Sequence, residues 1–222
     1  MGARLIPLPD RAEYRRRWAE LHGDASTSGM VGAWLDLMHA LAPAAVRLRL
    51  VPDAMSGLGV LVSVSALPLV AAGGRWVLAA AALVALGGVL DGLDGAVAVL
   101  TARATRWGFV LDSVCDRVSD TAYVVALWLL GAPGWACWTA GGLALLHEYV
   151  RARAAAGGMA GIGVVTVSER PTRVIVTAAC LLGAGLFPGT AVAWANVGAA
   201  AWVALGATGL AQLLVVVRRR LR

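Results

Sequence analysis

The chain has 222 residues, of which 59% are hydrophobic and 14% are charged, and its formal net charge is +6. Soluble domains contain about a quarter charged residues, so the composition favours a membrane protein and excludes a disordered chain. Three scattered cysteines exclude a disulfide scaffold. All basic residues are arginines, and most lie beside apolar segments, so their charge suits phosphate groups or an anionic lipid leaflet and not a nucleic acid.

Residues 1–50 are polar and rich in arginine, without the layout of a cleavable signal peptide. Trp34, Leu37 and Leu41 recur at helical spacing within residues 28–46. This spacing predicts an amphipathic juxtamembrane helix on the cytoplasmic surface of the membrane. A soluble helix that packs on the ends of the membrane spans is an equal alternative.

Six apolar segments follow, and most approach the length of about 20 residues that a helix needs to cross a bilayer. They cover residues 54–72, 76–99, 109–131, 135–150, 172–188 and 190–217. The fourth and fifth are short, so we expect their helices to continue beyond the apolar stretch. The predicted fold is all-α, with six transmembrane helices in a domain over residues 51–217, a cytoplasmic segment over 1–50 and a basic cytoplasmic tail over 218–222.

The arginines set the predicted orientation. With six spans, 18 of the 19 arginines share one side of the membrane with both termini, and Arg75 alone falls on the other side. The positive-inside rule makes the arginine-rich side cytoplasmic. We therefore expect a multi-pass protein of a bacterial cytoplasmic membrane, with its chemistry on the cytoplasmic side.

The end of the second span and the start of the third carry a cluster of aspartates. Asp91 and Asp94 are three residues apart, and Asp112 and Asp116 are four apart, so each pair shares one helix face. A tight connection containing Gly108 lets the two faces meet, so we expect all four carboxylates to converge. Gathered carboxylates repel one another and are unfavourable in a bilayer, so the cluster needs a cation. Oxygen ligands suit Mg²⁺ or Mn²⁺, which commonly act in pairs on phosphate groups.

This region resembles the signature of the CDP-alcohol phosphotransferase (CDP-alcohol phosphatidyltransferase) family, D-x2-D-G-x2-A-R-x8-G-x3-D-x3-D. Val99 stands where the family has Arg, which leaves Arg103 or Arg106 to supply that charge. Residues 51–56 are similar to the P-N-x-x-T segment that begins the family's first helix. Residues 148–153 and 168–173 resemble the branch that makes phosphatidylinositol phosphate and phosphatidylglycerol phosphate. Seven of the eight fixed signature positions match: Asp91, Asp94, Gly95, Ala98, Gly108, Asp112 and Asp116.

The resemblance implies a six-helix domain, usually a homodimer. The domain would transfer a phosphatidyl or related group from a CDP-alcohol such as CDP-diacylglycerol to a polar acceptor hydroxyl and release CMP. It implies that the four aspartates hold Mg²⁺ or Mn²⁺, with two ions expected, and that Asp116 is also the general base. The residues that it places at the nucleotide are Asp53, Ser56, Gly95, Ala98 and Gly108.

The acceptor implied by the branch is a phosphorylated polyol, such as inositol phosphate or glycerol phosphate. Arg151, Arg153, Arg170 and Arg173 are its candidate ligands, because guanidinium groups suit phosphate. Arginines at cytoplasmic span ends also follow from topology alone, so this assignment stays open.

Three neighbouring polar residues each allow more than one interpretation. Glu148 is expected either at the acceptor or paired with Arg151 or Arg153. Asp120 is expected to pair with Arg117 or another arginine, or to support the metal ligands. His147 is expected to be a solvated or interfacial side chain, and a proton relay beside Glu148 is the alternative.

Two other classes of protein also keep carboxylates in membrane helices. A non-enzymatic transporter would distribute them across the bilayer, whereas these gather at one edge. An aspartate-rich membrane prenyltransferase would need a second, separate aspartate motif and usually more helices. Release of CMP distinguishes the phosphotransferase from both.

Overall fold

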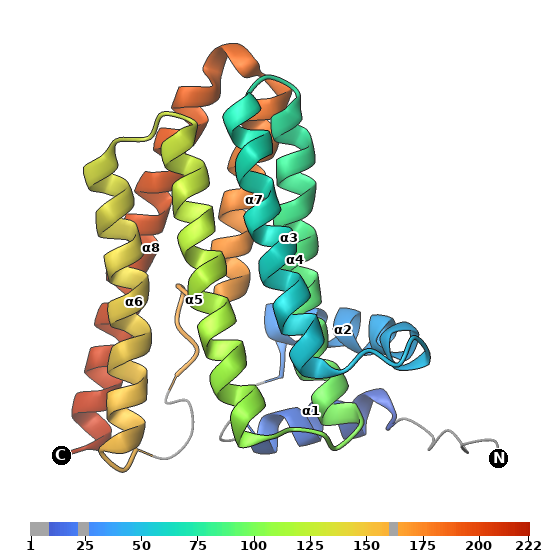
Figure 1. Cartoon of the computed structure of the whole chain (residues 1–222). Helices are drawn as coiled ribbons and strands as arrows, with labels where there is room; N and C mark the ends of the chain where they lie inside the picture. The colour runs from blue at the N-terminus through green and yellow to red at the C-terminus, as the bar shows by residue number, and fades with distance from the viewer. Residues whose placement is uncertain (1–8, 22–26, 160–163) are drawn as a thin grey trace.

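The computed structural model describes residues 9–21, 27–159 and 164–222, and every regular element in these ranges is a helix (Figure 1). The all-α prediction is therefore confirmed. The α-helices are α1 (Arg11–Leu21), α2 (Gly29–Arg47), α3 (Pro52–Ala72), α4 (Trp76–Leu100), α5 (Arg106–Leu129), α6 (Gly134–Ala156), α7 (Arg170–Leu186) and α8 (Ala191–Arg220), with a 3-10 turn, η1 (Pro188–Thr190), before α8.

Helices α3 to α8 form an up-and-down bundle, and they coincide with the six predicted apolar segments within a few residues (Figure 1). As expected, α6 continues past residue 150 to Ala156. Helix α7, in contrast, has 17 residues and is no longer than its predicted segment. Within the described residues, three segments are long and apolar enough to cross a membrane, namely Pro52–Ala72, Trp76–Leu100 and Pro188–Arg220. The remaining bundle helices, α5 to α7, are shorter or carry more charge.

Glycine and proline end the helices at one end of the bundle. Gly73 and Gly74 adopt positive φ angles of 70° and 57° between α3 and α4, a conformation that glycine adopts without the steric cost of a Cβ atom. Gly131, at φ 105°, precedes Pro133 between α5 and α6. The α3–α4 turn, which contains Arg75, lies at the opposite end of the bundle from α1 and the C-terminus (Figure 1).

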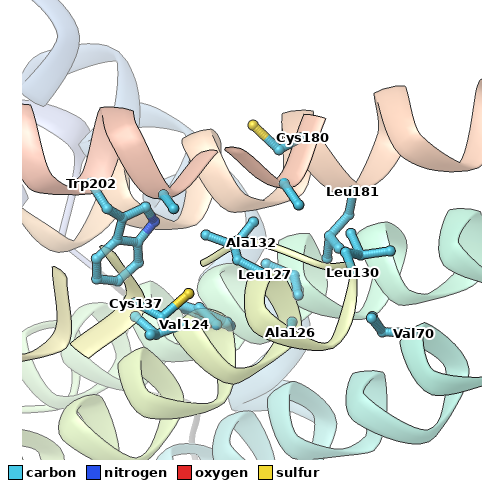
Figure 2. Close-up of a cluster of buried hydrophobic side chains, with 14 of the residues drawn as sticks. Val70, Val124, Ala126, Leu127, Leu130, Ala132, Cys137, Cys180, Leu181 and Trp202 are labelled. Carbon is cyan, nitrogen blue, oxygen red and sulfur yellow. The ribbon is translucent and has the colours of Figure 1, made fainter. Parts of the chain in front are cut away.

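The main core joins all six helices from α3 to α8, and Figure 2 shows part of it. Leu127 and Leu181 are fully buried there, and the Trp202 indole N–H donates to the Thr177 hydroxyl at 3.1 Å. That hydrogen bond satisfies the polar atoms that burial of the indole and the hydroxyl would otherwise leave unpaired. The core thus fixes α7 relative to α5, which positions the charged residues described below.

A second apolar cluster holds α1 and α2 against α4. Leu35 and Met38 of α2 are buried in it, while Leu37 and Leu41 are exposed. The structure therefore shows the packing of α2 on a bundle helix, which is one of the two alternatives predicted for it. Gly92 makes this packing possible, because a Cβ there would lie 2.7 Å from both the Met38 sulfur and the Trp34 ring.

Helix α1 is absent from the sequence prediction, because it is strongly polar. Its signals were local: the Asp10 carboxylate accepts from the Glu13 N–H at 2.8 Å as an N-cap, and Glu13 pairs with Arg17 one turn later. Its tertiary anchors are Tyr14, which is buried beside His39, and an ion pair between Arg15 and Asp36 of α2 at 2.7 Å.

Candidate active site

Three carboxylates converge where α4 and α5 approach each other. Asp91, Asp112 and Asp116 each offer one oxygen atom such that all three atoms lie within 4.8 Å of one another. The three residues are partly buried. Thr105 fixes the start of α5, because its hydroxyl accepts from the Gly108 N–H at 2.9 Å as an N-cap. The three oxygens form the donor set that a hard divalent cation prefers, so these residues fit a magnesium or manganese ion.

Asp94, the fourth predicted carboxylate, lies outside that group and is bonded to α3. The Ser56 hydroxyl donates to the Asp94 carboxylate, and both side chains are buried. The Asp94 carboxylate also accepts from the N–H of Gly95. The expected convergence of four carboxylates thus takes the form of three gathered groups and a fourth that is held by Ser56.

The other residues that the family signature implies lie around the same helix ends. A Cβ placed on Gly108 would lie 3.3 Å from an Asp53 carboxylate oxygen, so the starts of α3 and α5 meet there. A Cβ on Gly95 would meet nothing within 4 Å, so this side of α4 is open. Ala98 is partly buried on the same helix. Gly92 and Ala96 instead serve the packing of α2.

Val99 does not lie on the open side. Its side chain is 8% exposed and belongs to the apolar cluster with Leu35 and Met38. Arg103 and Arg106, the candidates for the missing charge, are exposed in the α4–α5 connection and at the first residue of α5. The chain therefore uses position 99 for packing and keeps its arginines at the water-exposed end.

Arg170, the first residue of α7, reaches the cluster of three carboxylates. One of its terminal nitrogens lies 2.8 Å from an Asp91 carboxylate oxygen, and the other contacts Asp116. A single guanidinium therefore joins α4 and α5. A planar fork of this kind suits two separate oxygen acceptors.

A buried ion-pair network continues from Asp116 along α5. Arg173 is 4% exposed and forms an ion pair with Asp120. The prediction that Asp120 pairs with an arginine is therefore confirmed. Arg117 lies 3.4 Å from both Asp116 and Asp120. Glu148 of α6 joins them, with distances of 3.2 Å to Arg173 and 3.6 Å to Arg117. Burial strengthens these interactions and makes any unpaired member unfavourable.

Residues 164–169, which lead into α7, are tied to the bundle through Glu169. Its carboxylate accepts from Arg151 at 2.8 Å and from the Thr166 N–H at 2.7 Å. Burial opposes the ionised form of Glu169, but the Arg151 and Thr166 contacts outweigh it and hold the pKa of Glu169 below its usual range. Val167 N–H donates to the Gln212 side chain of α8 at 3.1 Å.

Three residues in this region depart from the sequence prediction or were missing from it. His147 is fully buried, with Nε2 3.1 Å from the Thr166 hydroxyl, so its assignment as a solvated or interfacial side chain was wrong. Glu169 and Thr166 were missed. An acidic residue before the R-P start of a helix is the signal that points to Glu169 as an N-cap position. Arg153, in contrast to Arg151, is exposed.

The outer side of α5 carries a shallow apolar groove. Its volume is about 390 Å³, and it begins at the exposed Phe109 and passes Arg117 of the ion-pair network. The residues that line it are Phe109, Val110, Ser113, Val114, Arg117, Val118 and Thr121.

The sequence model of the CDP-alcohol phosphatidyltransferase family matches residues 49–207. This range contains the cluster of three carboxylates, the ion-pair network and most of the bundle. The chain belongs to the CDP-alcohol phosphatidyltransferase family. It is therefore a transferase that releases CMP from a CDP-alcohol in a reaction dependent on a divalent metal, and an integral membrane protein. The family excludes the transporter and prenyltransferase alternatives.

Two phosphatidylinositol phosphate synthases illustrate the sequence similarity. The enzyme of Mycolicibacterium smegmatis is 36% identical over 162 residues, which cover 69% of this chain and 70% of that protein. The enzyme of Cutibacterium acnes is 31% identical over 196 residues, which cover 84% of this chain and 94% of that protein.

Two crystal structures of the Mycobacterium tuberculosis phosphatidylinositol phosphate synthase resemble this transferase in fold. The complex with manganese and citrate has a TM-score of 0.67 at 29% identity, covering 82% of this chain and 88% of that one. The structure with CDP-DAG bound has a TM-score of 0.64 at 30% identity, covering 82% and 94%.

Proposed function

We propose that this transferase moves a phosphatidyl group from CDP-diacylglycerol to a hydroxyl of a phosphorylated polyol. Inositol phosphate is the first candidate acceptor and glycerol phosphate the second. The observation that carries the proposal is the position of Arg170 beside Asp91 and Asp116, because it places a phosphate-binding side chain next to the expected reacting centre. The names of the similar enzymes favour inositol phosphate.

We assign Asp91, Asp112 and Asp116 as metal ligands, with Asp94 as the fourth. The gathering of the first three supports this assignment. Two Mg²⁺ or Mn²⁺ ions, when bound, would neutralise the diphosphate of the CDP-alcohol. Asp94 would contribute from the neighbouring turn of α4, where Ser56 fixes its orientation.

Asp116 is the proposed general base. Its carboxylate takes the proton of the acceptor hydroxyl, and the resulting oxygen nucleophile attacks the phosphorus on the lipid side of the diphosphate. A new P–O bond to the acceptor forms while the bond to CMP breaks, and CMP leaves. Arg117 contacts Asp116 and would orient it. A positioned base of this kind contributes about 10²–10⁴-fold to rate.

The nucleotide would lie on the open side of α4. Gly95 and Ala98 leave space there, and Gly108 with Asp53 brings the starts of α3 and α5 to its edge. Ser56 would act through Asp94, to which it donates. Arg103 or Arg106 would supply the positive charge for the nucleotide phosphates.

The four candidate acceptor arginines divide by environment. Arg170 reaches the cluster of three carboxylates. Arg173 is buried against Asp120, and Arg151 forms an ion pair with Glu169. Arg153 is exposed on α6. We assign direct contact with the acceptor phosphate first to Arg170, and we assign Arg151 and Arg173 to the positioning of α7 and of the segment before it. Arg153 would contribute long-range attraction.

The proposed topology has six membrane spans, with the domain over residues 51–217 flanked by cytoplasmic segments over 1–50 and 218–222. Charge supports this orientation, because α1, the α4–α5 connection, the end of α6 and the C-terminus share one end of the bundle (Figure 1). Helix α2 would lie on the cytoplasmic surface with Leu37 and Leu41 towards lipid. The bacterial cytoplasmic membrane as its location and the homodimer are proposed from topology and from the family resemblance.

The test is release of CMP by purified protein in detergent with CDP-diacylglycerol and either Mg²⁺ or Mn²⁺. Inositol phosphate, glycerol phosphate, free inositol and serine form the acceptor panel. We expect release with a phosphorylated polyol, and loss of that release in Asp116→Asn. The matched control is Asp36→Asn, which removes a carboxylate of α2 that pairs with Arg15 away from the site. Release with serine or free inositol alone would contradict the proposed acceptor.

A further inference from the structure

The Arg170 guanidinium contacts two of the three carboxylates that are expected to hold the metal ions. The guanidinium lies 2.8 Å from Asp91 Oδ1 and contacts Asp116 Oδ1. Both residues belong to the group of three carboxylates that could hold a metal ion. The Arg170 side chain is only 10% exposed, so water does little to screen its charge.

A divalent cation and a guanidinium cannot share these carboxylates without strong repulsion. Each ligand oxygen has limited acceptor capacity, and two positive groups a few ångströms apart repel in a partly buried site. We propose that Arg170 and the divalent metal compete for Asp91 and Asp116. Metal binding then displaces the guanidinium and leaves it free for the acceptor phosphate that the proposed function assigns to it, and on that function this inference rests.

The neighbouring ion pair shows why only the Arg170 side chain needs to move. Asp116 and Asp120 are one turn apart on α5, and Arg170 and Arg173 are one turn apart on α7, so two arginine–aspartate contacts connect these helices. Arg173 also donates to the Ser168 carbonyl at 3.0 Å. Because that second contact is buried, α7 stays fixed against α5 while the first contact opens.

The competition predicts the direction in which the metal affinity changes when Arg170 is removed. If the Arg170 contact holds for about nine-tenths of the time, its removal raises the apparent affinity for metal about tenfold. By thermodynamic linkage, bound metal in turn lowers the population of the Arg170 contact. A residue of the reaction centre would therefore inhibit metal binding, although its loss also impairs transfer.

The experiment is a titration of purified protein in detergent with Mn²⁺ alone, without substrates, followed by the electron paramagnetic resonance signal of free Mn²⁺. We expect Arg170→Gln to bind Mn²⁺ about tenfold more tightly than the wild type. Arg170→Lys keeps the charge but loses the planar fork, so its affinity should fall between the two. Arg151→Gln is the matched control: it removes one positive charge that contacts Glu169 and Glu148 rather than the three gathered carboxylates.

An Arg170→Gln affinity equal to or weaker than wild type would overturn the competition, as would an equal gain in Arg151→Gln. If Arg170→Gln fails to fold, the ranking of Arg170→Lys against wild type decides, and an unchanged affinity in that variant overturns the proposal. CMP release by the wild type is measured separately. Release combined with unchanged Mn²⁺ affinities would reject the competition while the proposed function stands.

Discussion

Arg173 of α7 and Asp120 of α5 form an ion pair with both side chains almost completely buried, 53 residues apart in the chain. The pair lies one helical turn beyond the contact of Arg170 with Asp116, so the structural link and the reaction centre share the same two helices. Because α7 is held in a fixed position against α5, the Arg170 side chain is positioned beside Asp116.

Arg173→Met should strongly destabilise the protein, because it leaves the Asp120 carboxylate buried without its main partner. Loss of one member of a buried pair costs about 3–5 kcal/mol, while replacement of both by apolar residues is often neutral. Thermal unfolding in detergent should therefore show a large loss in Arg173→Met and recovery in the double variant with Asp120→Leu. Arg153→Met, at an exposed position of α6, should change stability by no more than about 0.5 kcal/mol. Equal stability of the single and double variants would contradict the pairing.

Gly92 and Gly95 should respond oppositely to alanine, although they lie one turn apart on α4. Gly92→Ala places a methyl group 2.7 Å from Met38 and Trp34, and overpacking of this kind costs about 1–3 kcal/mol. Gly95→Ala meets open space and removes a flexible residue from a helix, so stability should hold or rise by up to about 1 kcal/mol. Its methyl group fills the proposed nucleotide site, so CMP release should fall. Unfolding midpoints and initial rates for both variants test this, and full activity in Gly95→Ala would argue against the nucleotide assignment.

Glu169 should make stability depend on pH. Because its pKa is lowered in the folded state, the stabilisation is complete above the unfolded value, about 4.3, and is lost as pH falls through the folded pKa. Glu169→Gln should therefore be less stable than wild type at pH 7, and the difference should shrink as the solution is acidified below pH 4.3. Unfolding curves at several pH values measure it. A constant difference between the two proteins would show that the charge of Glu169 does not matter.

Val99→Arg restores the family residue, yet it should not raise activity. Val99 is buried among residues of α2 and α4, so a guanidinium there would be buried without a partner or would displace α2. We expect a lower unfolding midpoint and no gain in CMP release. Val99→Leu is the control for size, because it keeps the apolar character. A gain in CMP release by Val99→Arg would show that this side chain reaches the nucleotide.

Most of the bundle follows from local sequence. Apolar runs that are nearly long enough to span a bilayer specify α3 to α8, and turn residues such as Gly73, Gly74 and Pro133 separate them. Each run can form a helix by itself, because a helix satisfies its backbone hydrogen bonds internally whatever it packs against. The spacing of Asp91, Asp112 and Asp116 specifies their faces for the same reason. The helical period is a property of the segment itself, so these positions were predictable.

The partners of the charged residues required the tertiary structure. Arg170 with Asp91, Arg173 with Asp120, and the burial of His147 depend on how α4, α5, α6 and α7 cross, and the residues involved lie 19 to 79 positions apart. Sequence periodicity identifies the face of a helix but not the helix that this face meets, because long-range contacts depend on the packing of all the helices together. For the same reason, only the fold distinguished Gly92, which packs against α2, from Gly95, which is open.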